Sequence, residues 1–127
     1  MADGWRKAEG KKDWPMMITS HVLDTSIGRP ASGVAVALEL QEGDGWRAVA
    51  RGITNADGRI VDLLPPATPL GAALYRLTFD TGAYFAARSR SCFHPRVAVE
   101  FMVDDPAAHY HVPLLVSPFG YTTYRGS

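Results

Sequence analysis

Hydrophobic and polar residues alternate with a period of two along most of the chain after residue 16, which is typical of β-strands with one buried face. The alternation is clearest at 34–41, 75–80 and 97–103, where Val, Leu, Tyr and Phe occupy every second position. Weaker alternation predicts further strands at 18–23, 46–53 and 109–116. Turn-forming stretches separate these segments, and they read GDG at 43–45, NADG at 55–58 and LLPPATP at 63–69.

One short helix interrupts the strand pattern. Asp80 or Thr81 can cap it, and the residues that follow contain no strong helix breaker as far as Ala87. Six or more short strands with one helix predict an all-β fold, a β-sandwich. Residues 1–16 show no consistent period, so we expect a mobile N-terminal leader and one folded domain over residues 17–127.

Composition narrows the class of protein. Lys plus Arg and Asp plus Glu both number 13, so the chain has no overall charge that would attract nucleic acid or an anionic membrane surface. No apolar run approaches the roughly 20 residues that a membrane-spanning helix needs. The lone Cys92 cannot form an internal disulfide and fits a reducing compartment. We therefore expect a cytoplasmic protein with neither nucleic-acid nor membrane partners.

Three histidines are candidates for chemistry. Period two places His21 on the face of its strand that carries Thr19 and Leu23, while His109 and His111 share one face of a later strand. Each imidazole taken alone is typical of a surface or interface residue. A His-x-His pair with a third imidazole would also suit a metal. The sequence places no further ligand beside them, so we expect no metal.

Other residues carry weaker signals. Arg59 follows the NADG turn, which partly matches a calcium-binding loop but lacks the downstream Glu, so calcium is not expected. Cys92 and His94 have the spacing i, i+2 and would allow a nucleophile and base, although a single Cys among strands is more often a packing residue. Tyr124 and Arg125 near the C-terminus can bury area and bind anions, unlike most chain ends.

Five motifs taken together resemble the 5-hydroxyisourate hydrolase family over roughly residues 17–127. They are HVLDT at 21–25, GRPA at 28–31, TNADGR at 54–59, HYHVPLL at 109–115 and SPFGYTTYRGS at 117–127. The YRGS ending is the most specific, because it distinguishes these enzymes from the hormone-carrying transthyretins of the same fold. The chain departs from the family pattern at Phe119, at Thr122 and in CFHP at 92–95, all outside the expected catalytic positions.

The resemblance implies a transthyretin-like sandwich of two four-stranded sheets with one short helix, assembled as a homotetramer with active sites in clefts between subunits. It implies hydrolysis of 5-hydroxyisourate to 2-oxo-4-hydroxy-4-carboxy-5-ureidoimidazoline in urate catabolism, without metal or cofactor. By the same resemblance His109 supports the catalytic residues. These map onto His21, Arg59, His111 and Ser127, and substrate binding adds Tyr124, Arg125 and Gly126 to His21, Arg59 and Ser127.

The residue types suit this chemistry. A neutral imidazole can take a proton from water near pH 7, and either His21 or His111 would serve as the base. Arg59 offers a planar donor fork for substrate oxygens, and Ser127 offers a hydroxyl and a carboxylate that Gly126 allows to turn inward. A non-enzymatic small-molecule carrier and a sandwich module for protein interaction are the alternatives, and neither requires this set of side chains.

Overall fold

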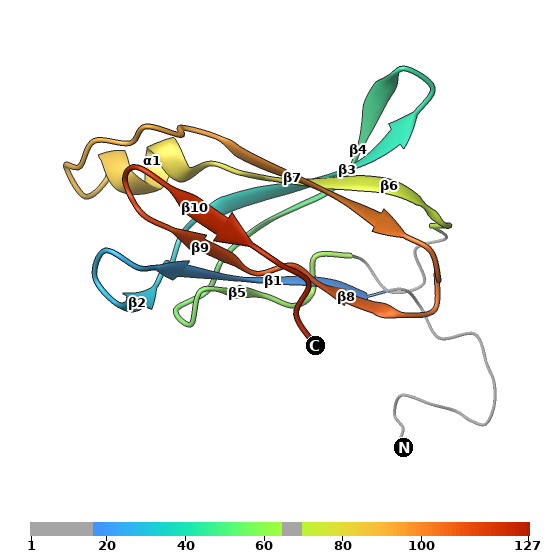
Figure 1. The fold of residues 1–127 in the computed structure, drawn as a ribbon, viewed down its shortest axis with the longest axis horizontal. Coiled ribbons are helices and arrows are strands. Elements are labelled where there is room, and N and C mark those ends of the chain that lie inside the picture. Colours follow the sequence, from blue (N-terminus) through green and yellow to red (C-terminus); the bar gives the residue numbers. More distant parts are fainter. Residues whose placement is uncertain (1–16, 65–69) are drawn as a thin grey trace.

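The fold is a sandwich of two β-sheets with one short helix at one end (Figure 1), as the sequence predicts. The computed structural model describes residues 17–64 and 70–127. The predicted leader at 1–16 and part of the LLPPATP stretch lie outside the described residues. Within those residues, no helix is both long and apolar enough to cross a membrane.

The first sheet is built around β1 (Met17–Asp24). On one side β1 pairs in parallel with β8 and then β9, and on the other side it pairs antiparallel with β2 and β5. The partners are β2 (Arg29–Pro30), β5 (Arg59–Ile60), β8 (His109–His111), β9 (Leu114–Val116) and, beyond β9, β10 (Tyr121–Thr123). The strand predicted at 109–116 is thus interrupted near Pro113, which has no backbone N–H to donate to a neighbouring strand. Six segments therefore make up this sheet, where four strands were predicted, because the polypeptide breaks into short pieces on both sides of β1.

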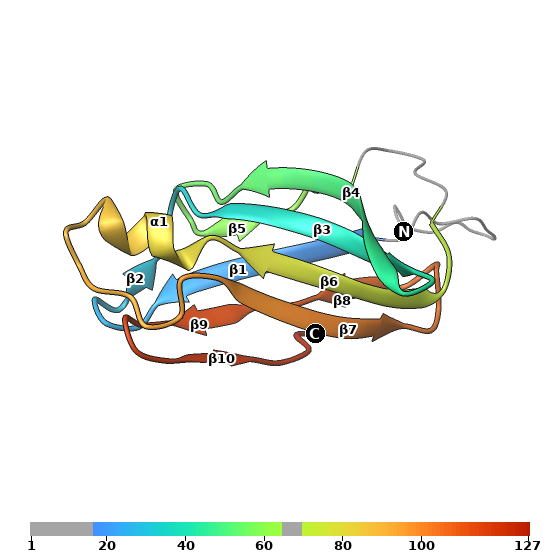
Figure 2. The same ribbon diagram turned by 90° about the horizontal axis from the view of Figure 1, so that it is seen from above.

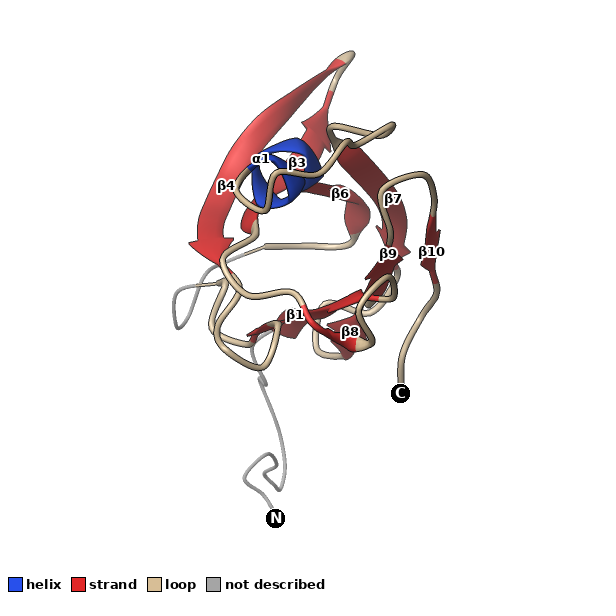
Figure 3. Ribbon diagram, turned by 90° about the vertical axis from the view of Figure 1, so that its left-hand side faces the viewer, coloured by secondary structure: helices blue, strands red, loops and turns tan. Residues whose placement is uncertain are grey.

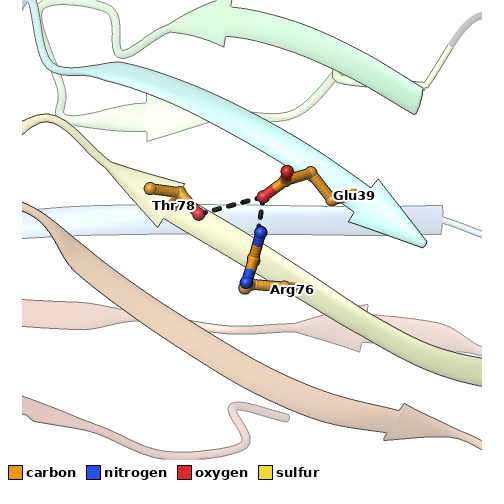
Figure 4. A network of polar contacts seen from close by, with 3 residues as sticks. All are labelled: Glu39, Arg76 and Thr78. Atoms are coloured by element: carbon orange, nitrogen blue, oxygen red, sulfur yellow. Dashed lines mark hydrogen bonds and ion pairs between the residues drawn. The ribbon is translucent and has the colours of Figure 1, made fainter. Parts of the chain in front are cut away.

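The second sheet has the order β4-β3-β6-β7 and is antiparallel throughout (Figure 2). Its strands are β3 (Ala35–Glu42), β4 (Gly45–Ile53), β6 (Ala73–Phe79) and β7 (Val97–Val103), which confirms the strands predicted at these positions. On its outward face Glu39 accepts hydrogen bonds from Arg76 Nε at 2.9 Å and from the Thr78 hydroxyl at 3.3 Å (Figure 4). The bond from Arg76 holds the pKa of Glu39 below its ordinary value. This face is polar, so the core lies on the other side.

The two sheets face each other (Figure 3), and both contribute buried apolar side chains to the core. Its side chains are the apolar members of the alternating segments, which confirms the predicted inward faces. The largest fully buried members include Tyr75, Phe79, Phe85, Ile18, Leu38, Leu77 and Leu114.

The helix α1 (Thr81–Ala86) closes one end of the sandwich and is tied to β1. Asp80 is the cap, because its carboxylate accepts a hydrogen bond from Ala83 N at 3.1 Å. The Tyr84 hydroxyl donates to Asp24 Oδ2 at 2.8 Å, and Asp24 is only 1% exposed. Burial and the hydrogen bond to Asp24 raise the pKa of Tyr84 to about 12, so the phenol keeps its proton. This bond holds the helix against the end of β1.

Candidate active site

Strand pairing brings three of the four predicted catalytic residues to neighbouring positions in the first sheet. His21 on β1 lies opposite Arg59 on β5, and Thr19 on β1 lies opposite His111 on β8. The C-terminal segment then pairs with β8 through a bridge between His111 and Gly126. Figure 1 shows β5, β1, β8 and the C-terminus side by side. Pairing of distant segments therefore gathers these residues on adjacent strands, with His111 two positions along β1 from the pair of His21 and Arg59.

The imidazoles of His21 and His111 are both on the outer face of the sheet. Ile18 and Val22 on β1 are buried in the core, so the alternate residue His21, which is half-buried, faces away from it. On β8 the buried residue is Tyr110, and its neighbours His109 and His111 face outward. This is the arrangement predicted from period two.

The NADG turn holds Arg59 in register with His21. The Asn55 side-chain oxygen accepts hydrogen bonds from the backbone N–H groups of Asp57 at 2.9 Å and Arg59 at 3.0 Å. Gly58 has a φ of 74°, and its carbonyl accepts a hydrogen bond from Val22 N at 2.7 Å. Ile60 in turn pairs with Ser20, so the chain is bonded to β1 on both sides of Arg59. The side chain of Arg59 is exposed.

The same turn orients His21. Its Nε2 lies 2.8 Å from the Asp57 carbonyl oxygen, and a carbonyl can only accept. Nε2 must therefore carry a proton, which leaves Nδ1 unprotonated whenever the ring is neutral. Asp57 thus acts through its backbone, and its carboxylate is not the group that holds the imidazole.

His111 is held by the Thr19 hydroxyl, and its pKa is lowered by its surroundings. Its Nδ1 lies 2.7 Å from the Thr19 hydroxyl oxygen, which also lies 2.7 Å from Nε2 of His109. Burial lowers the pKa of His111, and His109, Arg59 and His21 lower it further through charge repulsion. The ring is therefore neutral near pH 7.

The C-terminal segment packs directly on His111. Gly126 N donates to the His111 carbonyl at 2.8 Å, and a Cβ at Gly126 would lie 2.5 Å from His111 Cδ2. Sequence reasoning assigned Gly126 to a backbone turn, but it is not among the glycines with positive φ. A glycine is needed here because the backbone and the ring are in close contact. Ser127 follows and is exposed at the end of this segment.

Tyr124 and Arg125 point elsewhere in a single protomer. The Arg125 guanidinium lies 4.5 Å from the centre of the Tyr110 ring, on the side of β8 away from the imidazoles. Both residues line a cavity of about 320 Å³ together with residues of β7. Within one chain they do not join His21 and His111, and their role in substrate binding stays a prediction.

Sequence reasoning missed one residue of this group, Thr19. Its position two residues before His21 placed it on the correct face, but only the parallel pairing of β1 with β8 puts its hydroxyl between two imidazoles. The Cys92 and His94 alternative is not supported, because the thiol donates to the His94 backbone carbonyl at 3.2 Å and not to the imidazole. Within residues 17–64 and 70–127, no cluster of three His, Cys, Asp or Glu side chains is arranged to hold a metal ion.

Comparison with known proteins agrees with this fold. Residues 18–126 match the model of the HIUase/Transthyretin family. The chain is 43% identical over 111 residues to a 5-hydroxyisourate hydrolase of Salmonella dublin, covering 87% of this chain and 81% of the relative. It resembles the solved structure of Klebsiella pneumoniae 5-hydroxyisourate hydrolase with a TM-score of 0.76 and 40% identity, covering 87% of this chain and 99% of that one. For sea bream transthyretin in complex with thyroxine the TM-score is 0.80 and the identity 35%, covering 86% and 93%. The chain therefore belongs to the HIUase/Transthyretin family.

Proposed function

We propose that this protein hydrolyses 5-hydroxyisourate to 2-oxo-4-hydroxy-4-carboxy-5-ureidoimidazoline in urate catabolism. The observation that carries the proposal is the gathering of Arg59, His21 and His111 on the outer face of one sheet, with Gly126 packed against His111. Relatives at similar identity that bear the name 5-hydroxyisourate hydrolase support it. The sequence left open which imidazole is the base, and we assign that role to His111.

His111 is suited to be the base because its lowered pKa keeps the ring neutral near pH 7. With Nδ1 bonded to Thr19, Nε2 is the nitrogen left to take a proton from water. The water oxygen forms a bond to the acyl carbon of the substrate ring, and its proton passes to Nε2. The carbon–nitrogen bond then breaks, and the proton on Nε2 passes to the departing ring nitrogen. His111 ends the cycle neutral, so the reaction needs no other proton donor.

Arg59 and His21 complement this base. The carbonyl oxygen gains negative charge as water adds, and the guanidinium of Arg59 offers two parallel donors to it from an exposed position. His21 Nε2 is committed to the Asp57 carbonyl, so the free Nδ1 of its neutral ring can accept a hydrogen bond from the substrate or from the attacking water. Ser127, next to Gly126, supplies a hydroxyl that orients the substrate beside His111.

The carrier alternative has one observation in its favour, the similarity to a transthyretin solved with thyroxine. A carrier and a hydrolase of the same fold differ in the side chains of the site, and the C-terminal segment separates them. A carrier tolerates changes to its tail, whereas the proposed enzyme needs the backbone of Gly126 against His111.

The test follows the ultraviolet decay of freshly generated 5-hydroxyisourate in the presence of three proteins. These are the parent, a variant lacking residues 124–127, and a variant with a purification tag after Ser127. We expect hydrolysis only by the parent, while circular dichroism and the melting temperature show that all three are folded. The same tag on the N-terminus is the matched control and should leave the rate unchanged. Full activity with the C-terminal tag would exclude the role given to the terminus and favour the carrier.

A further inference from the structure

The Thr19 hydroxyl lies between two imidazoles, and this geometry restricts where protons can sit. Its oxygen is 2.7 Å from Nδ1 of His111 and 2.7 Å from Nε2 of His109. A hydroxyl has one proton to donate, so one imidazole must accept from Thr19 and the other must donate to it. Thr19 is only 4% exposed, so water competes little for these bonds. The three groups therefore share their protons as one unit.

Only one of the two possible arrangements makes His111 a base. If Thr19 donates to His109, then Nδ1 of His111 must be protonated, and Nε2 of the neutral ring is free to accept a proton from water. If Thr19 donates to His111 instead, Nε2 carries the proton and cannot serve as a base. The imidazole that accepts the Thr19 proton thus decides the tautomer of His111.

The same contacts offer a route for the proton that His111 takes up. Burial and the guanidinium of Arg59 on β5 make a positive charge on the His111 ring unfavourable. The other titratable groups facing this ring are His21 of β1 and His109 of its own strand. The Nδ1 proton can move to the Thr19 oxygen while the Thr19 proton moves to Nε2 of His109. The charge then rests on His109, which is exposed to water, and His111 keeps a proton on Nε2 for the departing nitrogen. As that proton leaves, both shifts reverse, so Nδ1 of His111 regains its proton and His109 becomes neutral again.

We propose that Thr19 is a positioning residue, whose hydroxyl sets the tautomer of His111 and passes a proton between His111 and His109. This inference rests on the proposed function for its kinetic consequence, but the tautomer can be measured without substrate. Thr19→Val removes the hydroxyl at nearly constant shape and suits a strand, and Thr19→Ser restores it. Thr25→Val is the control, because the Thr25 hydroxyl donates to the backbone of Val116, away from the imidazoles.

Ring nitrogen-15 NMR of the free full-length protein gives the first readout. In the parent, we expect His111 protonated on Nδ1 and not on Nε2, and in Thr19→Val a mixture of both tautomers. The second readout is the rate of 5-hydroxyisourate decay. Thr19→Val should lower kcat about 10- to 100-fold with KM changed less than about twofold, short of the ~10²–10⁴-fold loss on removal of a general base. Thr19→Ser should recover most of that loss, and Thr25→Val should match the parent.

His109→Ala provides a second variant, since His109 is exposed and its loss should not affect folding. Without its acceptor the Thr19 proton turns to His111 Nδ1, so Nε2 of His111 becomes protonated and kcat falls as in Thr19→Val. A His111 tautomer that stays the same in both Thr19→Val and His109→Ala would overturn the inference, as would an unchanged kcat in both. If the variants shift the His111 tautomer but the parent does not hydrolyse 5-hydroxyisourate, the proposed function fails while the coupling through Thr19 stands.

Discussion

At the scale of single residues, the lowered pKa of His111 predicts how the rate depends on pH. The folded protein binds a proton at His111 less tightly than the unfolded chain does, because burial and nearby cations lower its pKa from the ordinary value near 6.5. We expect the acid limb of kcat/KM to lie below pH 6.5 for this reason. Rates measured from pH 5 to 8 check this, and an acid limb above 6.5 would contradict it.

The lowered pKa of His111 also makes the free energy of unfolding depend on pH. Between the two pKa values the unfolded chain binds more protons than the folded one, so the free energy of unfolding must rise with pH in that window. The contribution of His111 is therefore lost as pH falls below about 6.5. Urea titrations at several pH values measure it, and His111→Asn should flatten the dependence in that window.

Arg59→Lys separates the charge at this position from its donor geometry. Lysine keeps the positive charge near His111, so the acid limb of the pH profile should stay where it is in the parent. It loses the two parallel donors, and we expect kcat to fall about 10²-fold, the scale found when one donor to a developing oxyanion is removed. Steady-state kinetics with the melting temperature as a folding control test this. A Lys variant with the parent rate would make Arg59 a turn residue only.

At the scale of elements, the NADG turn depends on Gly58 for two reasons that can be separated. Gly58 has a φ of 74°, and an added Cβ would lie 2.3 Å from the Val22 carbonyl oxygen. Gly43 also has a positive φ, of 58°, but an added Cβ there meets nothing within 4 Å. Gly43→Ala should cost about 1–2 kcal/mol from backbone strain alone, and Gly58→Ala should cost more. Urea denaturation compares them, and equal losses would mean that contact with β1 is unimportant.

The C-terminal segment allows a similar comparison. A Cβ at Gly126 would lie 2.5 Å from the His111 ring, whereas at Gly120 the nearest atom is 4.0 Å away. Gly126→Ala must therefore displace the ring or the tail, and we expect a loss of activity of about 10²-fold, because a misplacement near 1 Å can cost that much. Gly120→Ala should keep the parent rate. Both variants should melt close to the parent, and an active Gly126→Ala would show that the tail is free to move.

At the scale of the whole molecule, the outer strands β7 and β10 lie on the same side of the sandwich (Figure 3). Outer strands offer backbone hydrogen-bonding groups to another chain, and Met102 of β7 and Tyr121 of β10 are exposed apolar residues beside them. This supports the predicted homotetramer. Light scattering should give four times the 13.8 kDa chain mass. Met102→Lys should lower that mass, while Ile53→Lys on the opposite outer strand should not, and a monomeric, active parent would contradict the assembly.

The sequence by itself determined the features that depend on neighbours along the chain. Strands at 34–41, 75–80 and 97–103 follow from period two, and the helix follows from its Asp80 cap, because side-chain alternation and capping are local. Motif resemblance added His21, Arg59 and His111 without any knowledge of their contacts. These residues could be named in advance because each stands in a turn or strand with a recognisable pattern.

Only the tertiary structure decided how those residues meet. The pairing of β1 with β8 in parallel brings Thr19 to His111 across 92 positions, and no local pattern encodes which strands become neighbours. The interruption at Pro113, the stacking of Arg125 on Tyr110 and the contact of Gly126 with the His111 ring are set in the same way. Pairing of distant strands depends on how the whole core packs, so proton positions in the site follow from the fold and not from any single segment.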